Sequence, residues 1–352
     1  REEDMIELKN DTLVFSFPEV HPEARFSLEF QRTLRIPDDD RDYPLPPGLG
    51  TFPLRHVDDF RDRVPAPWVR HGGVMLPIYQ SEALWVNFSN GVLRNSFGYP
   101  FAVKVATGKV DAVTGEQWRD GIHRDPQDYM VMPEQPWLDG YCVEKGTIRQ
   151  FVAMPLGERY SVEEQVTGKA EFGGLQVVAY PMKAEAYRAY LERHRVRQVD
   201  DTVLYCAEVM PAPLESLSPA PDMSLAPGGR MKQEIFEDPF DFHVWDTRQS
   251  SRCFVHMANS MVWQAITGSP PPTPAPTAKD YASAGLPWYE YYGGDTRALG
   301  GSDILAGVRS VLQMGAAKGQ QPLPENEGAE PETVVHLGKG PLKPGQVREG
   351  AF

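Results

Sequence analysis

Short apolar runs separated by glycine, proline and aspartate dominate the stretch from residue 128 to residue 182. Within it, residues 141–143 and 148–154 flank the turn Glu144-Lys145-Gly146, and a further apolar run follows at 175–180. Runs of this length bounded by turn residues are typical of strands joined by tight connections. The 33 prolines and 31 glycines continue the pattern over all 352 residues, which favours a β-rich protein over a helical bundle.

The fold class predicted from these runs is mainly β, of the β-rich α+β kind. Alternating apolar and polar residues at 13–17 and 26–30 predict two half-buried strands, and a run at 109–113 is expected to continue the strand at 101–105 across a bulge at Gly108. An amphipathic helix is predicted at 184–197, from the apolar spacing of Tyr187, Tyr190, Leu191 and His194. We therefore expect an antiparallel sandwich or distorted barrel with one helix packed on it.

A change in composition at residue 269 divides the chain into a globular body, 1–268, and a Pro/Gly-rich C-terminal arm, 269–352. The Pro/Ser-rich stretch 211–227 is the candidate for an internal boundary of the body. In the arm, the proline run at 270–276 predicts an extended spacer. One amphipathic helix is predicted at 302–314, with Ser302 as its N-cap and Gly315 beyond its end.

Net charge, the length of the apolar runs and cysteine content limit the partners and the location that the sequence predicts. The net charge of −14 repels phosphate backbones, so nucleic-acid binding is not expected. The longest apolar runs fall short of 18 residues, so no membrane span is predicted either. Three widely spaced cysteines without a CxxC pair fit a reducing compartment, and the expected location is the cytoplasm.

Trp137, Asp139, Arg149 and Gln150 are the candidate ligand-binding residues. An aromatic face close to acidic, basic and amide side chains is the usual composition of a sugar or small-molecule pocket. The favoured alternative is that Trp137 packs in the core while Asp139 and Gly140 form a tight turn into the hairpin.

Other fragments lack the spacing that a known site requires. The acidic stretch 38–42 has neither the glycine nor the glutamate of a calcium loop at the required positions, and no cofactor motif is present. His56 with Asp58, and His243 with Asp246, resemble halves of metal sites without second halves. Ser161 to Glu164 matches a capping box, which predicts the exposed first turn of a short helix.

Four aromatic residues follow the proline spacer: Trp288, Tyr289, Tyr291 and Tyr292. A patch of this kind mediates association when it is exposed and acts as a lid when it packs on its own chain. Our first functional hypothesis is a non-enzymatic structural or interaction module that associates with itself, or with another protein, through the arm. The alternatives are a small-molecule binder or hydrolase-like enzyme with its pocket near Trp137, and a metal-binding protein. The sequence leaves open whether the protein is an enzyme.

Overall fold

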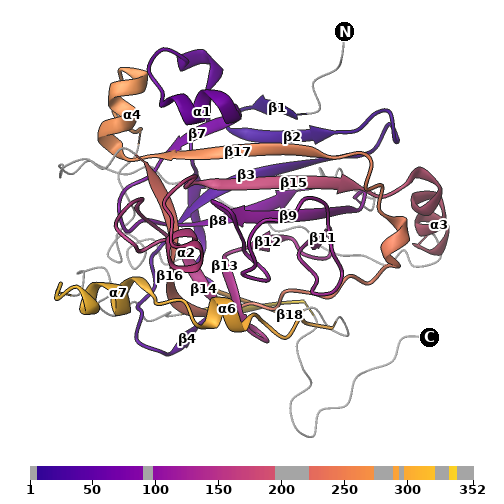
Figure 1. Ribbon diagram of the computed structural model, residues 1–352. Coiled ribbons are helices and arrows are strands. Elements are labelled where there is room, and N and C mark those ends of the chain that lie inside the picture. The colour runs from indigo at the N-terminus through magenta and orange to yellow at the C-terminus, as the bar shows by residue number, and fades with distance from the viewer. Residues whose placement is uncertain are drawn as a thin grey trace, which may run out of the picture.

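The computed structural model describes residues 6–89, 98–194, 222–272, 288–292, 297–321 and 333–338. Two large, mostly antiparallel sheets make up most of this part of the chain, and strands outweigh helices (Figure 1). The predicted mainly β class is confirmed. Over the ranges given, neither sheet closes into a barrel, so the sandwich alternative is the one that applies.

The larger sheet has ten strands: β1 (Ile6–Lys9), β2 (Thr12–Ser16), β3 (Arg25–Thr33), β4 (Asp42–Tyr43), β5 (Gly48–Thr51), β8 (Ala83–Ser89), β12 (Trp137–Leu138), β13 (Gly140–Glu144), β14 (Thr147–Pro155) and β16 (Met223–Lys232). Its main order is β1-β2-β3-β8-β14-β16-β4, with β5, β12 and β13 paired to β3, β8 and β14. All pairs are antiparallel except β16 with β4. The predicted hairpin of β13 and β14 and the predicted strands β2 and β3 are confirmed.

The smaller sheet has seven strands: β6 (Arg55–His56), β7 (Val74–Pro77), β9 (Phe101–Thr107), β10 (Val110–Asp111), β11 (Met130–Met132), β15 (Leu175–Pro181) and β17 (Ser251–Ala258). Its order is β10-β9-β15-β17-β7-β6, with β11 on β9. Every residue of β9 and β15 is buried, which explains why both strands are mostly apolar on both faces, with Lys104, Thr107 and Gln176 as the buried polar exceptions.

The core lies between the two sheets, where aromatic rings from both of them meet. Phe26 of β3 packs on Phe101 of β9, with ring centroids 4.8 Å apart. The hydroxyl of Tyr141 in β13 donates a hydrogen bond of 2.9 Å to Thr107 Oγ1 in β9. Apolar packing and a buried polar contact thus hold the two layers together.

Gly108 lies in a hairpin turn and not in a bulge, so the predicted continuation of β9 is wrong. Val110 pairs antiparallel with Thr107, which reverses the chain over two residues. Gly108 has φ +54, and a Cβ at this position would lie 2.3 Å from the carboxyl carbon of Glu163. The turn therefore needs glycine for both its backbone conformation and its packing.

Six helices are present in the described ranges, where one helix packed on the body, one in the arm and a short one after Ser161 were expected: α1 (Ala66–His71), α2 (Val162–Thr167), α3 (Ala184–His194), α4 (Ser260–Thr267), α6 (Asp303–Ala306) and α7 (Val311–Ala317). Helix α3 confirms the predicted helix as far as His194, beyond which the structure does not describe the chain. Two short 3₁₀ helices, η1 (Asp58–Phe60) and η3 (Phe242–Val244), complete the set. No helix in these ranges is long and apolar enough to cross a membrane.

The capping box at Ser161 and Glu164 is confirmed, but the expected exposure of this first turn is wrong. Glu163 is buried, and its carboxylate accepts hydrogen bonds from the backbone N–H groups of Phe172 and Gly173. Glu164 is also buried, and it accepts a hydrogen bond of 2.8 Å from the backbone N–H of Arg159. Both carboxylates hold neighbouring loops in place.

The helix predicted at 302–314 is two short helices. Ser302 caps the first one as expected, accepting a hydrogen bond from Leu305 N. Ser310 then begins α7 through a capping box with Gln313, so the chain leaves the helical path before residue 311. Gly315 lies inside α7, and the predicted C-terminal end is wrong.

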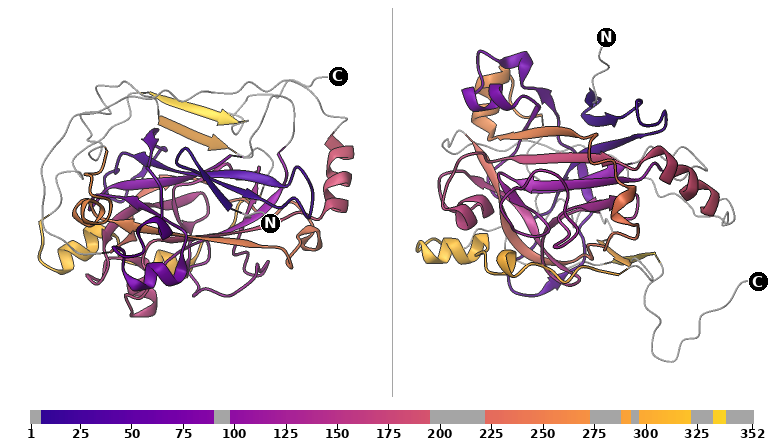
Figure 2. Two further views of the ribbon diagram at one scale, coloured as in Figure 1. Left: turned by 90° about the horizontal axis from the view of Figure 1, so that it is seen from above. Right: turned by 45° about the vertical axis from the view of Figure 1, so that its right-hand side comes forward.

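Strands β18 (Trp288–Tyr292) and β19 (Val334–Gly338) form a separate parallel pair, which lies along one edge of the body in the left view of Figure 2. Tyr289 and Leu45 exchange two backbone hydrogen bonds of 2.8 Å each, which join β18 to the body. The division at residue 268 stays a prediction. Of the candidate boundary 211–227, residues 211–221 lie outside the description, and residues 223–227 belong to β16.

Candidate functional site

Gln150 and Arg149, two of the candidate ligand residues, are neighbours on β14, and each makes internal contacts. Gln150 is fully buried, and its amide bonds to Leu34 O at 2.8 Å and to Ile36 N at 3.0 Å. Arg149 Nη1 donates to Asp38 Oδ1 at 3.0 Å and to a backbone carbonyl of β16 at 2.9 Å. Both side chains cross-link β14 to the loop that begins at Leu34.

Asp139 and Trp137 point to other neighbours. The Asp139 carboxylate accepts a hydrogen bond of 2.8 Å from Gln233 Nε2, and burial raises its pKa to about 7. Trp137 is half-buried and meets Trp85 edge to face, with ring centroids 6.4 Å apart. The four candidate residues therefore do not meet around one cavity. None of them lines the cavity of about 490 Å³ that is described next.

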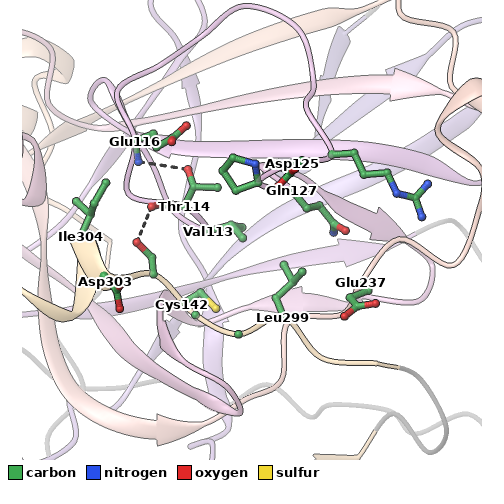
Figure 3. Close-up of a pocket in the computed structure, with 15 residues that line it drawn as sticks. Val113, Thr114, Glu116, Asp125, Gln127, Cys142, Glu237, Leu299, Asp303 and Ile304 are labelled. Carbon is green, nitrogen blue, oxygen red and sulfur yellow. Dashed lines mark hydrogen bonds between the residues drawn. The ribbon is translucent and has the colours of Figure 1, made fainter.

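A cavity of about 490 Å³ lies elsewhere, between the body and the arm (Figure 3). Its walls come from five places in the sequence: the turn after β10, the loop before β11, one residue of β13, one residue of the segment after β16, and the chain that leads into α6. The lining residues are Val113, Thr114, Glu116, Arg124, Asp125, Pro126, Gln127, Cys142, Glu237, Leu299, Gly300, Gly301, Ser302, Asp303 and Ile304.

The arm forms one wall of this cavity and is held there by main-chain and side-chain hydrogen bonds. Leu299 N donates to Ile235 O at 2.8 Å, and Ser302 N donates to Cys142 O at 3.0 Å. The Ser302 hydroxyl, which also caps α6, donates to Thr114 O. Leu305 is buried on the next turn of chain. Removing the arm would thus remove a wall of the cavity.

Acidic side chains predominate at the cavity. Glu116, Asp125, Glu237 and Asp303 supply four carboxylates, and Arg124 supplies the single basic side chain of the lining. The Arg124 guanidinium is directed to backbone carbonyls, with Nη1 2.7 Å from the oxygen of residue 240. Glu116 pairs with Arg119 at 2.8 Å. The remaining acidic residues leave the cavity with an excess of negative charge.

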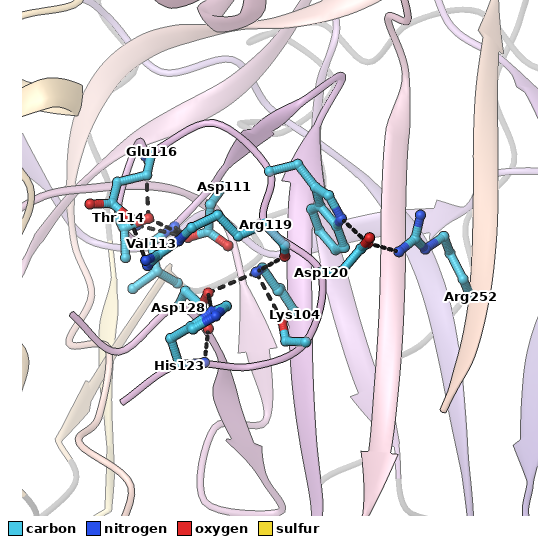
Figure 4. Close-up of polar contacts among 12 residues, drawn as sticks. Lys104, Asp111, Val113, Thr114, Glu116, Arg119, Asp120, His123, Asp128 and Arg252 are labelled. Atoms are coloured by element: carbon cyan, nitrogen blue, oxygen red, sulfur yellow. Dashed lines mark hydrogen bonds and ion pairs between the residues drawn. The ribbon is translucent and has the colours of Figure 1, made fainter. Parts of the chain in front are cut away.

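A network of buried charges lies behind the wall formed by residues 113–116 (Figure 4). Lys104 Nζ bonds to Asp128 Oδ2 at 2.7 Å and to two backbone carbonyls of the 119–121 loop. His123 Nδ1 lies 2.8 Å from the same Asp128 oxygen. Asp111 begins the turn that forms the wall, and burial raises its pKa to about 7. This network positions the loops that line the cavity.

Two of the three cysteines lie in the described ranges, and both are free thiols in buried positions. Cys142 lines the cavity, and burial raises its pKa to about 12. Burial also raises the pKa of Cys253 to about 12. At neutral pH both sulfurs are therefore protonated, which makes them poor nucleophiles.

The candidate metal and interaction residues are placed separately. The structure places His56 in β6 and Asp58 in η1, and His243 in η3, and no group of three or more His, Cys, Asp or Glu side chains gathers as a metal site in the part of the chain it describes. Trp288 is buried and Tyr289 is half-buried against the body. The side chains of Tyr291 and Tyr292 lie outside the described atoms.

The sequence patterns do not identify the cavity, and Ser302 is predicted only as a helix cap. Thr114, Cys142 and Ser302 are far apart in the chain, and each belongs to an ordinary turn, strand or cap when taken alone. The one local signal is Asp111 followed by Thr114, a turn-forming pair.

Comparison of the chain with protein-family models, with curated proteins and with solved structures finds no match, so the function has to be argued from the site itself.

Proposed function

We propose that the protein binds a small organic cation in the cavity between the body and the arm. The observation that carries the proposal is a cavity of about 490 Å³ lined by four carboxylates and one arginine. Ligand pockets usually enclose roughly 300–1,000 Å³. Four carboxylates around a partly enclosed space lower the energy of a positive charge placed between them.

The arrangement favours a ligand that carries two positive groups joined by a short apolar chain. The carboxylates come from different segments, so a ligand with two cationic ends can contact more than one of them. Leu299, Ile304 and Val113 supply apolar surface in the same lining. Single exposed ion pairs contribute little, so we expect affinity in the micromolar to millimolar range and a strong dependence on salt.

Isothermal titration of the full-length chain with agmatine tests the proposal, because agmatine carries a guanidinium and a primary ammonium. Citrate is the matched anionic probe. We expect agmatine to bind at low salt and citrate not to bind. Glu237→Gln should weaken agmatine binding, while Glu185→Gln on α3, which contributes no lining residue, should leave it unchanged. Equal binding of agmatine and citrate, or no binding of agmatine, contradicts the proposal.

Self-association through the arm stays a prediction. The contacts of Tyr289, Leu299 and Ser302 with the same chain support a clasp within one molecule, and they leave association through other parts of the arm open. Native mass spectrometry of the full chain and of a chain without residues 269–352 tests it. A full chain that is monomeric at micromolar concentration would dismiss the idea. A cytoplasmic location belongs to the same set of predictions, and cell fractionation tests it.

A further inference from the structure

We propose that Asp111, which lies behind the cavity wall and not in it, sets the affinity of the cavity for cations. This inference rests on the proposed function. Asp111 ends β10, and its Oδ1 accepts hydrogen bonds from Val113 N at 3.0 Å and from Thr114 N at 2.8 Å. Val113 and Thr114 both line the cavity, so the carboxylate is separated from it by the thickness of one turn.

Among the described residues, the second oxygen of this carboxylate has no hydrogen-bond partner. Asp111 is 2% exposed, and its Oδ2 is a buried polar atom for which the described chain offers no donor. Leaving such an atom unpaired is costly when the group is ionised. The turn itself needs only Oδ1, which an asparagine would supply equally well. The negative charge that Asp111 can carry is therefore not required by the fold of the turn.

The charged groups that face Asp111 come from several elements, and they do not neutralise it. Lys104 on β9 attracts the Asp111 charge, but the ammonium is already bound to Asp128 at 2.7 Å and to two carbonyls. Asp128 adds repulsion, and the Cys142 thiol on β13 is protonated. On α2, which packs on β10, Glu163 is bound to backbone N–H groups. On the arm side, Asp303 begins α6 at the cavity rim.

Proton binding by Asp111 therefore changes the field in the cavity. Burial raises the pKa of Asp111 to about 7, so the carboxyl group is mostly neutral at pH 6 and mostly ionised at pH 8. For two unit charges about 10 Å apart in a medium with an effective dielectric constant of about 20, the attraction corresponds to roughly a tenfold change in binding constant. A cation should therefore bind roughly tenfold more tightly at pH 8 than at pH 6.

Calorimetric titration of the full-length chain with agmatine at pH 6 and pH 8, at constant ionic strength, tests the inference. Both cationic groups of agmatine keep their protons over this range. We expect the affinity of the natural chain to rise with pH and that of Asp111→Asn to be nearly independent of pH. Glu116→Gln at the cavity rim should weaken binding at both pH values and keep the rise. His123→Gln, which removes the ionisable ring bound to Asp128, should also keep the rise.

The outcomes separate the two proposals. No agmatine binding at either pH overturns the proposed function, and this inference with it. Binding that rises with pH to the same extent in Asp111→Asn and in the natural chain overturns only the inference. Circular dichroism and urea midpoints of each variant report whether it is folded, and His123→Gln with a flat profile would assign the proton to the histidine and overturn the role of Asp111.

Discussion

Replacing Asp139 with asparagine should make the stability of the protein less sensitive to a rise in pH from about 4 to about 7. Asp139 is buried on all sides, and its carboxylate accepts one side-chain hydrogen bond, from Gln233 Nε2. Burial raises its pKa to about 7, while an aspartate in the unfolded chain has a pKa of about 3.9. The folded state therefore holds the proton more tightly than the unfolded state does. The stability linked to this group is complete below about pH 4 and is lost as the pH rises to about 7.

The size of the effect follows from the two pKa values. Each pH unit between them corresponds to about 1.4 kcal/mol, so full ionisation of Asp139 lowers the free energy of unfolding by roughly 4 kcal/mol. From pH 5 to pH 8 the loss is roughly 2.5 kcal/mol. Asparagine cannot ionise, and its Oδ1 can still accept the hydrogen bond from Gln233. Between pH 5 and pH 8, the unfolding free energy of Asp139→Asn should therefore rise relative to that of the natural chain by roughly 2.5 kcal/mol.

Urea unfolding followed by tryptophan fluorescence at pH 5, 6, 7 and 8 measures this difference. Comparing the slopes of unfolding free energy against pH removes any pH-independent cost of the substitution. Asp111 contributes equally to the slope in both proteins. Asp62→Asn, a change of an exposed aspartate, is the matched control and should leave the slope unchanged. If the stabilities of the variant and the natural chain run parallel over the whole pH range, the pKa of Asp139 is not raised in the folded state, and the reasoning is refuted.

Two further substitutions test the interior contacts by urea unfolding. Lys104→Met leaves the buried Asp128 carboxylate without the lysine ammonium and should lower the unfolding free energy by roughly 3–5 kcal/mol. The double variant Lys104→Met with Asp128→Asn should recover part of this loss. Equal stability of the single and double variants would contradict this account. Ser161→Ala removes the capping hydrogen bond to Glu164 N and should cost about 1 kcal/mol, whereas Ser269→Ala, outside any helix, should be neutral.

Local patterns predicted local structure well. The β13–β14 hairpin, the first strands and the helix at 184–194 each follow from turn residues or apolar spacing within a few neighbouring positions. Two of the misplaced features were also local in origin. Gly108 suits a bulge and a hairpin turn equally well, and Glu163, which packs against it, decides between them. Ser310 interrupts the arm helix because its hydroxyl caps a new helix, although apolar spacing continues past it.

The candidate site could not be predicted in the same way. Trp137, Asp139 and Arg149 are close in sequence, but alternation along strands and turns sends their side chains to different neighbours. The cavity is formed by residues that are far apart in the sequence but close in the fold. Residues 113–116, Cys142 and residues 299–304 meet only when the sheets are assembled. No pattern in a single window of sequence identifies such a meeting.

The wall that the arm contributes also has a consequence for protein synthesis. Chains are made from the N-terminus, and domains begin to fold while later residues are still inside the ribosome. The carbonyls of Thr114 and Cys142, which Ser302 occupies in the finished protein, stay open to water until residues 299–304 emerge. We therefore expect a nascent chain with a folded body to be unable to retain a ligand, and binding to begin only once translation has passed the arm.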